Sequence, residues 1–327
     1  MSPSLHPGIA ILGPTASGKT HLGLSLAERF HGEIISCDAL QVYRGMDVGT
    51  AKAGADERKR VPHHMLDIRN PGEDFSAGDY QRSARQCLDA IRSNGNLPFV
   101  VGGTGFYMRA LIDGLFEGPG RSDSLRVRMR RIVERRGSAC LHCALRRVDR
   151  TAAARLAPAD AARIIRAYEI YILTGRPMSW WTRQPRDALR GYKWLKLGIA
   201  LPRPLLYERI NSRVEEMFEA GFVEEVRELR GRYPRNSQAF KAIGYREITA
   251  YLEGRLTLRQ AVGETQQESR RYAKRQMTWF RSDADVHWLD GAIDQGTLVA
   301  KAAKRVAEFL ESSSASPDDA PSHLTFH

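Results

Sequence analysis

The first 114 residues alternate between short apolar runs and longer amphipathic stretches. Three apolar runs are short enough to be buried strands, at residues 9–12, 33–36 and 98–103. Apolar residues at helical spacing predict helices between and after them, at 18–30, 76–94 and 105–113, the second with Ser76 as a candidate N-cap. Strands that alternate with helices indicate a parallel sheet covered by helices, so the pattern predicts an α/β fold.

The pattern changes after residue 117. Residues 123–188 are predicted to be wholly helical, with no strand signal. Strand-like alternation returns at 191–201 and again at 286–290, with four helices predicted between them, at 203–219, 221–231, 242–253 and 257–281. We therefore predict a discontinuous phosphate-loop α/β core at 1–116 and 191–312, an all-helical insertion at 117–190 and a disordered polar tail at 313–327.

Composition and chain ends narrow the class of protein. No apolar run approaches the roughly 20 residues that span a bilayer, and the N-terminal MSPSLHPG lacks the features of a secretory signal. The four cysteines are too few for a disulfide scaffold and fit a reducing compartment. We expect a cytoplasmic protein, and nothing in the sequence demands an oligomer, so we expect a monomer.

Positive charge is concentrated in the predicted insertion. The chain carries a net charge of +12, and residues 121–190 hold 17 arginines, no lysine and six acidic residues, a net charge of +11. Charge this concentrated is typical of a nucleic-acid-binding surface, although a solvated helical face would also explain part of it.

Several side chains admit both a functional and a structural interpretation. Cys140 and Cys143, with His142 between them, could form half of a zinc site, but no second pair exists. We interpret the pair 63–64 as structural, because adjacent residues on a strand point in opposite directions. We interpret Trp180 and Trp181 as packing a helix end rather than stacking a base.

The segment GPTASGKT, at residues 13–20, has the spacing of a phosphate-binding loop between a strand and a helix. Its glycines let backbone N–H groups turn toward phosphate oxygens, and the helix N-terminus adds its positive end. Lys19 supplies a charge, and the Thr20 hydroxyl can ligate Mg²⁺. The residues expected to hold the phosphates are Gly13, Pro14, Thr15, Ala16, Ser17, Gly18, Lys19 and Thr20.

Two further polar residues follow predicted strands, at the edge where open parallel sheets bind ligands. Asp38 comes after the second strand, where it could hold Mg²⁺, act as a general base or cap the next element. Thr104 follows the third strand among Gly102, Gly103 and Gly105. Because that strand ends in Gly-Gly-Thr rather than in an acid, an ordinary nucleoside triphosphatase is disfavoured.

Six segments in order give the chain a family resemblance: GPTASGKT, IISCDALQVYRGMDVGTAKA, VPHHMLDI, VGGTGFYMRAL, AIGYREI and RRYAKRQMTWFR. Together they resemble the bacterial tRNA dimethylallyltransferases, which prenylate an adenine beside the anticodon. The resemblance runs from about residue 8 to about residue 292, most of the chain. It implies a phosphate-loop core with a helical insertion.

The resemblance also implies a reaction. The loop would hold the diphosphate of dimethylallyl diphosphate with Mg²⁺ near Thr20, so that a carbon–oxygen bond breaks rather than a phosphorus–oxygen bond. Asp38 would accept the proton of the adenine amine, with Thr104 beside the amine and the diphosphate and Lys19 neutralising the leaving group. An arginine of RINSR, Arg209 or the favoured Arg213, would add a diphosphate contact.

Contacts to tRNA are implied in the same way. Because the adenine must leave its stack to reach the site, the residues expected to border it or hold the tRNA are Asp38, Ala39, Leu40, Gln41, Thr104, Arg126, Asp160, Ala161, Ala162, Arg163, Ile164, Lys241, Ala242, Ile243, Gly244, Tyr245 and Arg246. The Arg-rich insertion would clamp the anticodon stem through phosphates.

The chain departs from the family pattern at three places, with Ala39 for a serine, Ser269 for a threonine and DAAR for DPQR. Three other functions stay open: a prenyltransferase acting on free adenine nucleotides, a phosphate-loop kinase of small molecules, and a non-catalytic RNA-binding module. Neither of the first two requires the basic insertion, and the third leaves Lys19, Thr20 and Asp38 without a role.

Overall fold

The computed structural model describes residues 5–314, in two compact units formed by Met1–Ile112 with Leu189–His327 and by Asp113–Ala188. We call them the core unit and the helical unit. Their borders lie within four residues of the predicted ones. The predicted disordered tail begins inside the last helix and lies, beyond residue 314, outside the described residues.

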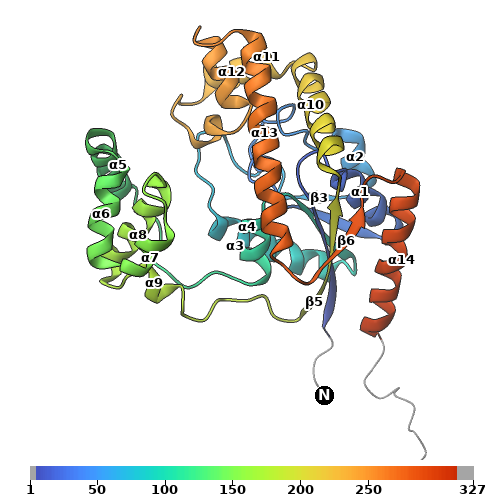
Figure 1. The fold of residues 1–327 in the computed structure, drawn as a ribbon. Coiled ribbons are helices and arrows are strands. Elements are labelled where there is room, and N and C mark those ends of the chain that lie inside the picture. The colour runs from blue at the N-terminus through green and yellow to red at the C-terminus, as the bar shows by residue number, and fades with distance from the viewer. Residues whose placement is uncertain (1–4, 315–327) are drawn as a thin grey trace, which may run out of the picture. The chain divides into compact units, whose positions relative to one another are not determined.

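A six-stranded sheet, parallel throughout, forms the centre of the core unit, in the order β3-β2-β4-β1-β5-β6 (Figure 1). The α/β prediction is therefore confirmed. The strands are β1 (His6–Leu12), β2 (Gly32–Ser36), β3 (His63–His64), β4 (Leu97–Gly102), β5 (Tyr192–Ala200) and β6 (Val286–Asp290). Both neighbours of β1 are other strands, so the phosphate loop that follows it lies near the middle of the sheet edge.

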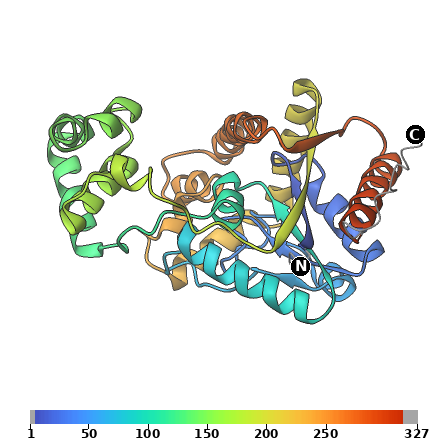
Figure 2. The same cartoon turned by 90° about the horizontal axis from the view of Figure 1, so that it is seen from below.

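Helices cover both faces of this sheet. α1 (Lys19–Arg29) and α14 (Gln295–Ser314) pack on the face that carries Ile9 and Ile11, whereas α3 (Ala77–Ser93) and α4 (Gly105–Ile112) pack on the face that carries Ala10 and Leu12 (Figure 2). The alternation of β1 side chains thus buries both faces. α14 is absent from the helices predicted from the sequence, although its Leu298, Ala302 and Val306 recur at helical spacing and are buried against α1.

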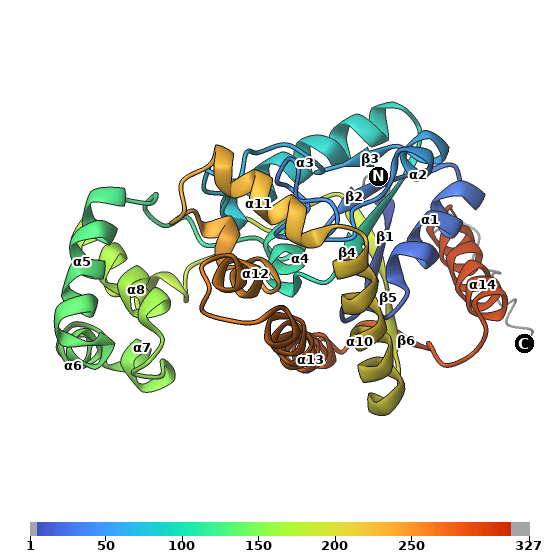
Figure 3. The same cartoon turned by 90° about the horizontal axis from the view of Figure 1, so that it is seen from above.

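A second group of helices lies beyond the carboxyl ends of the strands (Figures 1 and 3). α10 (Arg203–Glu219) and α12 (Tyr245–Leu252) both pack against the long α13 (Leu258–Arg281), and α11 (Phe222–Arg232) packs against α12. The chain between β2 and β3 joins this group, because Val42, Tyr43 and Met46 share a buried cluster with α11 and α12. The remaining short elements of the core unit are α2 (Ala55–Arg60) and η1 (Gln238–Lys241).

The helical unit has its own small apolar core, in which Met129, Leu141, Leu145 and Ile164 are buried. Its helices are α5 (Asp123–Arg136), α6 (Ser138–Val148), α7 (Arg150–Arg155), α8 (Ala161–Thr174) and α9 (Met178–Trp181). The two connecting segments meet in an antiparallel bridge between Phe116 and Arg186. The unit is thus helical apart from its bridged ends.

One buried carboxylate organises the charges inside the helical unit. The side chain of Glu169 is 0 % exposed. It accepts hydrogen bonds from the Ser122 N–H, from Nε and Nη2 of Arg126 and from Nη1 of Arg166, at 2.6 to 2.9 Å. Although burial alone would raise its pKa, the hydrogen bonds from Arg126 and Arg166 lower the pKa of Glu169 to about 2. Arg126 is thereby committed to an internal ion pair.

We expect Glu169→Ala to lower the free energy of unfolding of the helical unit by about 3 kcal/mol, because two guanidinium groups lose their buried partner. A carboxyl group whose pKa is lower in the folded than in the unfolded state stabilises the fold at pH values above its unfolded-state pKa. This stabilisation is lost as pH falls through the folded-state pKa. The wild-type unit should therefore weaken between about pH 4.5 and about pH 2. Hydrogen exchange of residues 113–188 measures both effects, with exposed Glu134→Gln as the control; equal protection in both variants would contradict the prediction.

Two of the remaining sequence candidates, His142 and Trp181, have structural partners within the helical unit. His142 Nε2 lies 2.9 Å from the Ala153 carbonyl oxygen, while Cys140 and Cys143 are exposed. Among residues 5–314 no three His, Cys, Asp or Glu side chains form a group that could hold a metal ion. The Trp181 indole donates to Thr174 Oγ1 and packs beside Phe116. In the described part of the chain, no helix has the length and apolar character needed to span a membrane.

Candidate active site

The phosphate loop has the backbone form that its sequence requires. Ala16 and Gly18 both have positive φ, 61° and 89°, a backbone form that is typical of loops whose amides converge on an anion. A Cβ at Gly13 would lie 2.6 Å from Ser17 Oγ, so the first glycine is needed for the tight turn. Because Gly18 caps α1 without a side chain, the first amides of the helix face the loop unblocked.

Lys19 carries a perturbed ammonium group at the start of α1. Its Nζ donates to the Pro14 carbonyl oxygen across the loop, at 3.1 Å. Burial, followed by the nearby Arg213, lowers the pKa of Lys19 to about 8, and Asp38 opposes this shift. Burial and the neighbouring Arg213 thus disfavour the charged form of Lys19, and an anionic ligand would relieve both effects.

Asp38 and Thr104 are held together where β2 and β4 end. The Ala39 N–H donates to Thr104 Oγ1 and the Thr104 N–H donates to the Cys37 carbonyl oxygen, each at 3.1 Å. One carboxylate oxygen of Asp38, Oδ1, accepts from the Leu40 N–H at 2.9 Å. This local hydrogen bond fixes the carboxylate orientation and leaves its second oxygen for other partners.

A cavity of about 330 Å³ joins these groups at the carboxyl edge of the sheet. Twelve of the predicted site residues line it: Thr15, Lys19, Thr20, Asp38, Ala39, Leu40, Gln41, Thr104, Arg213, Lys241, Ala242 and Ile243. The structure adds residues from α10, α11 and α13 that local sequence did not indicate, among them Val214, Met217, Phe222, Tyr272 and Gln276. The cavity is therefore charged at the sheet edge and at Arg213, apolar at Val214, Met217 and Phe222, and largely polar along α13.

The structure separates the two arginines of the RINSR segment. Arg213 lines the main cavity, where its Nη2 lies 3.5 Å from the Thr50 carbonyl oxygen and its buried Nε has no hydrogen-bond partner among the described residues. Burial lowers the pKa of Arg213, and Asp38 opposes this. Arg209 instead borders a separate cavity of about 20 Å³ with Ser17 and His21. Of the two, only Arg213 can meet a ligand shared with Lys19 and Asp38.

Gln276 connects two loops of the site and was not singled out by the sequence. Its Oε1 accepts from the Thr15 N–H at 2.9 Å, and its Nε2 donates to the Gly103 carbonyl oxygen at 2.8 Å. One side chain of α13 thus joins the phosphate loop to the loop that carries Thr104. Its position five residues before the end of α13 offered no local signal of this contact.

The segment 241–246 only partly matches its predicted role. Tyr245 is fully buried and its hydroxyl donates to Glu225 at 2.7 Å, which corrects the expectation that its side chain meets a ligand. Gly244 is also buried, because a Cβ there would lie 2.6 Å from the Phe222 ring. Lys241 and Arg246 remain exposed, the latter paired with Glu247.

The predicted contacts of the helical unit divide in the same way. Asp160 caps α8 by accepting from the Arg163 N–H, and Ile164 is buried, so the expected surface role of the Ile164 side chain is corrected. Ala162 and Arg163 are exposed. Five arginines of α5 are exposed as well: Arg128, Arg130, Arg131, Arg135 and Arg136. These exposed guanidinium groups provide phosphate-binding chemistry on this unit.

Comparison with known proteins gives a consistent set of matches. A family model described as IPP transferase matches residues 41–283. The tRNA dimethylallyltransferase of Koribacter versatilis is 50 % identical over 89 % of this chain and 95 % of that protein, and that of Solibacter usitatus is 45 % identical over 93 % and 99 %.

Solved structures match over the same span. The tRNA isopentenylpyrophosphate transferase of Bacillus halodurans is 41 % identical with a TM-score of 0.71, covering 94 % of this chain and 98 % of that one. A eukaryotic dimethylallyltransferase, solved in crystallographic snapshots of its action on tRNA, is 25 % identical with a TM-score of 0.77, covering 94 % and 80 %.

Proposed function

This chain belongs to the IPP transferase family, the tRNA dimethylallyltransferases, and we propose that it transfers a dimethylallyl group from dimethylallyl diphosphate to the exocyclic amine of the adenine on the 3′ side of the anticodon in tRNA. The observation that carries the proposal is the single cavity in which Lys19, Asp38, Thr104 and Arg213 meet. The chain would act as a monomer in the cytoplasm.

The leaving diphosphate is the group that this site is suited to stabilise. As the allylic carbon–oxygen bond breaks, its electron pair passes to the diphosphate oxygen. The amides of residues 16–19, the Lys19 ammonium and the Arg213 guanidinium are fixed before the reaction, so they stabilise that charge without reorganising. The apolar helix side of the cavity, with Val214, Met217 and Phe222, suits the five-carbon prenyl chain.

Magnesium fits the hydroxyl side of the loop. Thr20 lines the cavity, and Mg²⁺ is commonly held by a hydroxyl or carboxylate together with water and substrate phosphates rather than by an all-protein cage. Thr20 would hold the ion, which would supply further neutralisation of the diphosphate. The lack of a preformed ligand group among residues 5–314 fits such an arrangement.

Asp38 would receive the proton of the acceptor amine. The adenine amine is a weak nucleophile because its lone pair is delocalised into the ring. As the new carbon–nitrogen bond forms, the amine proton would pass to the Asp38 oxygen that does not accept from Leu40. Thr104 would hold the Asp38–Ala39 backbone in place through its hydroxyl.

The tRNA itself would be held largely through its phosphates. The exposed arginines of α5 and Arg163 provide charge without base specificity, so affinity should fall as salt rises. The target base would leave its stack to enter the cavity, which the unpaired anticodon loop makes less costly. Leu40 and Gln41 line that cavity and would border the flipped base.

The proposal is tested by incubating the protein with unmodified tRNA, dimethylallyl diphosphate and Mg²⁺. The tRNA is then digested, and its nucleosides are identified by mass spectrometry. A prenylated adenosine at the position next to the anticodon is the expected product. Prenylated AMP with unmodified tRNA would replace the proposal with a free-nucleotide enzyme, and ATP turnover on a small acceptor would replace it with a kinase.

Affinity for dimethylallyl diphosphate should fall as pH rises through about 8. The bound diphosphate raises the pKa of Lys19 above its free value of about 8, so binding above that pH takes up a proton. The affinity for dimethylallyl diphosphate should fall by up to about tenfold per pH unit, until the pH reaches the pKa of Lys19 in the complex. Calorimetry in buffers of different ionisation enthalpy measures the proton uptake, and Lys19→Gln should abolish it. Uptake that persists in this variant would assign the effect to another group.

A further inference from the structure

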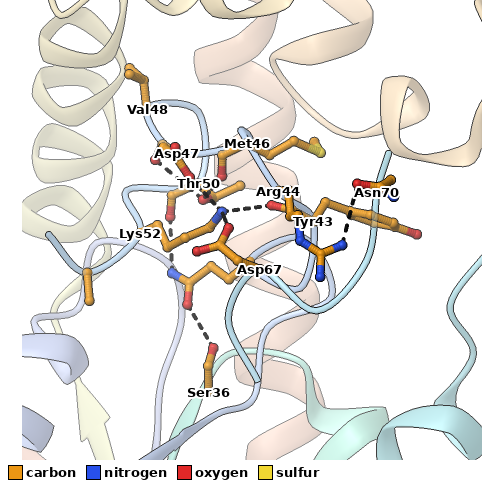
Figure 4. Close-up of polar contacts among 12 residues, drawn as sticks. Ser36, Tyr43, Arg44, Met46, Asp47, Val48, Thr50, Lys52, Asp67 and Asn70 are labelled. Carbon is orange, nitrogen blue, oxygen red and sulfur yellow. Dashed lines mark hydrogen bonds and ion pairs between the residues drawn. The ribbon is translucent and has the colours of Figure 1, made fainter. Parts of the chain in front are cut away.

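The chain between β2 and β3 supplies one wall of the cavity, and its end is fixed by an internal lysine. Gly49 and Thr50 line the cavity. The Lys52 ammonium is only 1 % exposed and lies 2.7 Å from the Tyr43 carbonyl oxygen, 2.6 Å from Asp47 Oδ1 and 2.7 Å from Asp67 Oδ1 (Figure 4). Residues 43–52 are thereby closed into a loop of defined shape, which we call the wall loop.

A carboxylate from a different element holds the tip of the wall loop. The Glu225 carboxylate of α11 accepts hydrogen bonds from three consecutive backbone amides. Its Oε2 accepts from the Asp47 and Val48 N–H groups at 2.8 and 2.6 Å, and its Oε1 accepts from the Gly49 N–H at 3.2 Å. The Tyr245 hydroxyl donates to Oε1 at 2.7 Å. Successive amides that converge in this way form an anion-binding concavity, occupied here by the protein's own carboxylate.

Packing leaves the tip little freedom. A Cβ at Gly49 would lie 2.1 Å from the Phe222 ring and 2.7 Å from the Tyr245 hydroxyl oxygen. The loop backbone is therefore pressed directly against α11 and α12. Glu225 sets the distance and direction of that contact, because it is the group that satisfies the tip amides.

The residue after the tip connects both sides of the proposed active site. The Thr50 carbonyl oxygen accepts from Gln41 Nε2 at 3.3 Å and lies 3.5 Å from Arg213 Nη2. Gln41 also accepts from Ser36 Oγ at 2.7 Å, which fixes its amide orientation. In the proposed function Gln41 borders the acceptor base and Arg213 binds the diphosphate, so one carbonyl connects the groups for both substrates.

We infer that Glu225 is a positioning residue for prenyl transfer: by holding the tip of the wall loop it places the Thr50 carbonyl, and through it Gln41 and Arg213, in register for the two substrates. The inference rests on the proposed function. Glu225 is not among the residues that line the cavity, so it would act on both substrates only through the wall loop. Its effect should therefore appear in the kinetic constants for both substrates at once.

The test compares Glu225→Ala with Glu224→Gln. Glu224 is the neighbouring acidic residue, 62 % exposed and paired with Arg227 on the surface of α11. Glu224→Gln should therefore leave kcat/KM for both substrates unchanged. We expect Glu225→Ala to lower kcat/KM about 10- to 100-fold for dimethylallyl diphosphate and for tRNA, because small misplacements of positioning groups cost that much. Affinity for inorganic diphosphate alone, measured by calorimetry, should fall in parallel.

Two milder variants keep the inference testable if Glu225→Ala does not fold. Glu225→Gln keeps one oxygen for two donors and should give an intermediate loss, and Tyr245→Phe removes a single donor and should give a smaller one. In an Arg213→Lys background, Glu225→Ala should cost much less than tenfold, because both changes act on the same contact.

The outcomes separate the two proposals. If Glu225→Ala lowers only the melting temperature and leaves the kinetic constants of the folded enzyme unchanged, Glu225 is structural and the inference is overturned. Additive losses in the Arg213→Lys background would overturn the route from Thr50 to Arg213. If the wild-type protein and Glu224→Gln both fail to prenylate tRNA, the proposed function fails instead.

Discussion

Replacement of Asp38 by asparagine is expected to lower kcat for prenyl transfer by about 10²- to 10⁴-fold, the usual contribution of a positioned general base. Asparagine has nearly the same shape, and its carbonyl oxygen can still accept from the Leu40 N–H, so the turn after β2 should persist. It cannot accept a proton from the adenine amine. The affinities for tRNA and dimethylallyl diphosphate should change far less than kcat.

Single-turnover prenylation of tRNA, followed by nucleoside mass, measures this loss. Asp56→Asn is the matched control, since Asp56 is an exposed residue of α2 that pairs with Lys59 on the surface. A rate within a few fold of wild type in Asp38→Asn would remove the general-base role. A large drop in diphosphate affinity would instead assign Asp38 to the donor side, for example as a partner of Mg²⁺.

Replacement of Lys19 by glutamine is expected to lower kcat/KM for dimethylallyl diphosphate by about 10²- to 10³-fold, comparable to the loss of one preorganised donor to a developing anion. The ammonium is placed by its contact with the Pro14 carbonyl and by the start of α1, where the loop amides converge. Glutamine fills similar space but carries no charge. Because tRNA is proposed to bind through other residues, its dissociation constant should stay within about twofold of wild type.

Steady-state kinetics with varied dimethylallyl diphosphate, together with a filter-binding assay for tRNA, separates the two substrates. Lys59→Gln, an exposed lysine of α2, controls for the general loss of one positive charge. An equal loss of tRNA affinity in Lys19→Gln would show that the lysine acts on the acceptor instead. Unchanged donor kinetics would mean that the loop amides and Arg213 suffice to stabilise the leaving group.

Local sequence pattern was sufficient to predict which residues lie at the sheet edge. The phosphate loop, Asp38 and Thr104 each follow an apolar run, and parallel strands bring their carboxyl ends to one edge, so local pattern was enough to place these residues together. The helical insertion was equally visible, because helical spacing and the arginine count are properties of a continuous stretch.

The residues that surround that edge depend on contacts between elements that are distant in the chain. Glu225 meets amides that lie 176 to 178 residues earlier in the chain, and Gln276 meets an amide 261 residues earlier. Neither side chain differs locally from an ordinary helical residue. The same is true of Arg213 and Arg209, which differ by one helical turn yet border different cavities.

The physical reason is the range of the forces involved. Strand and helix periodicity depends on neighbours within a few residues, and the sequence displays it directly. A hydrogen bond between distant elements depends on how helices pack, which fixes which side of α10, α11 or α13 faces the cavity. The sequence therefore determined which residues could carry the chemistry, and packing decided which of the others hold them in place.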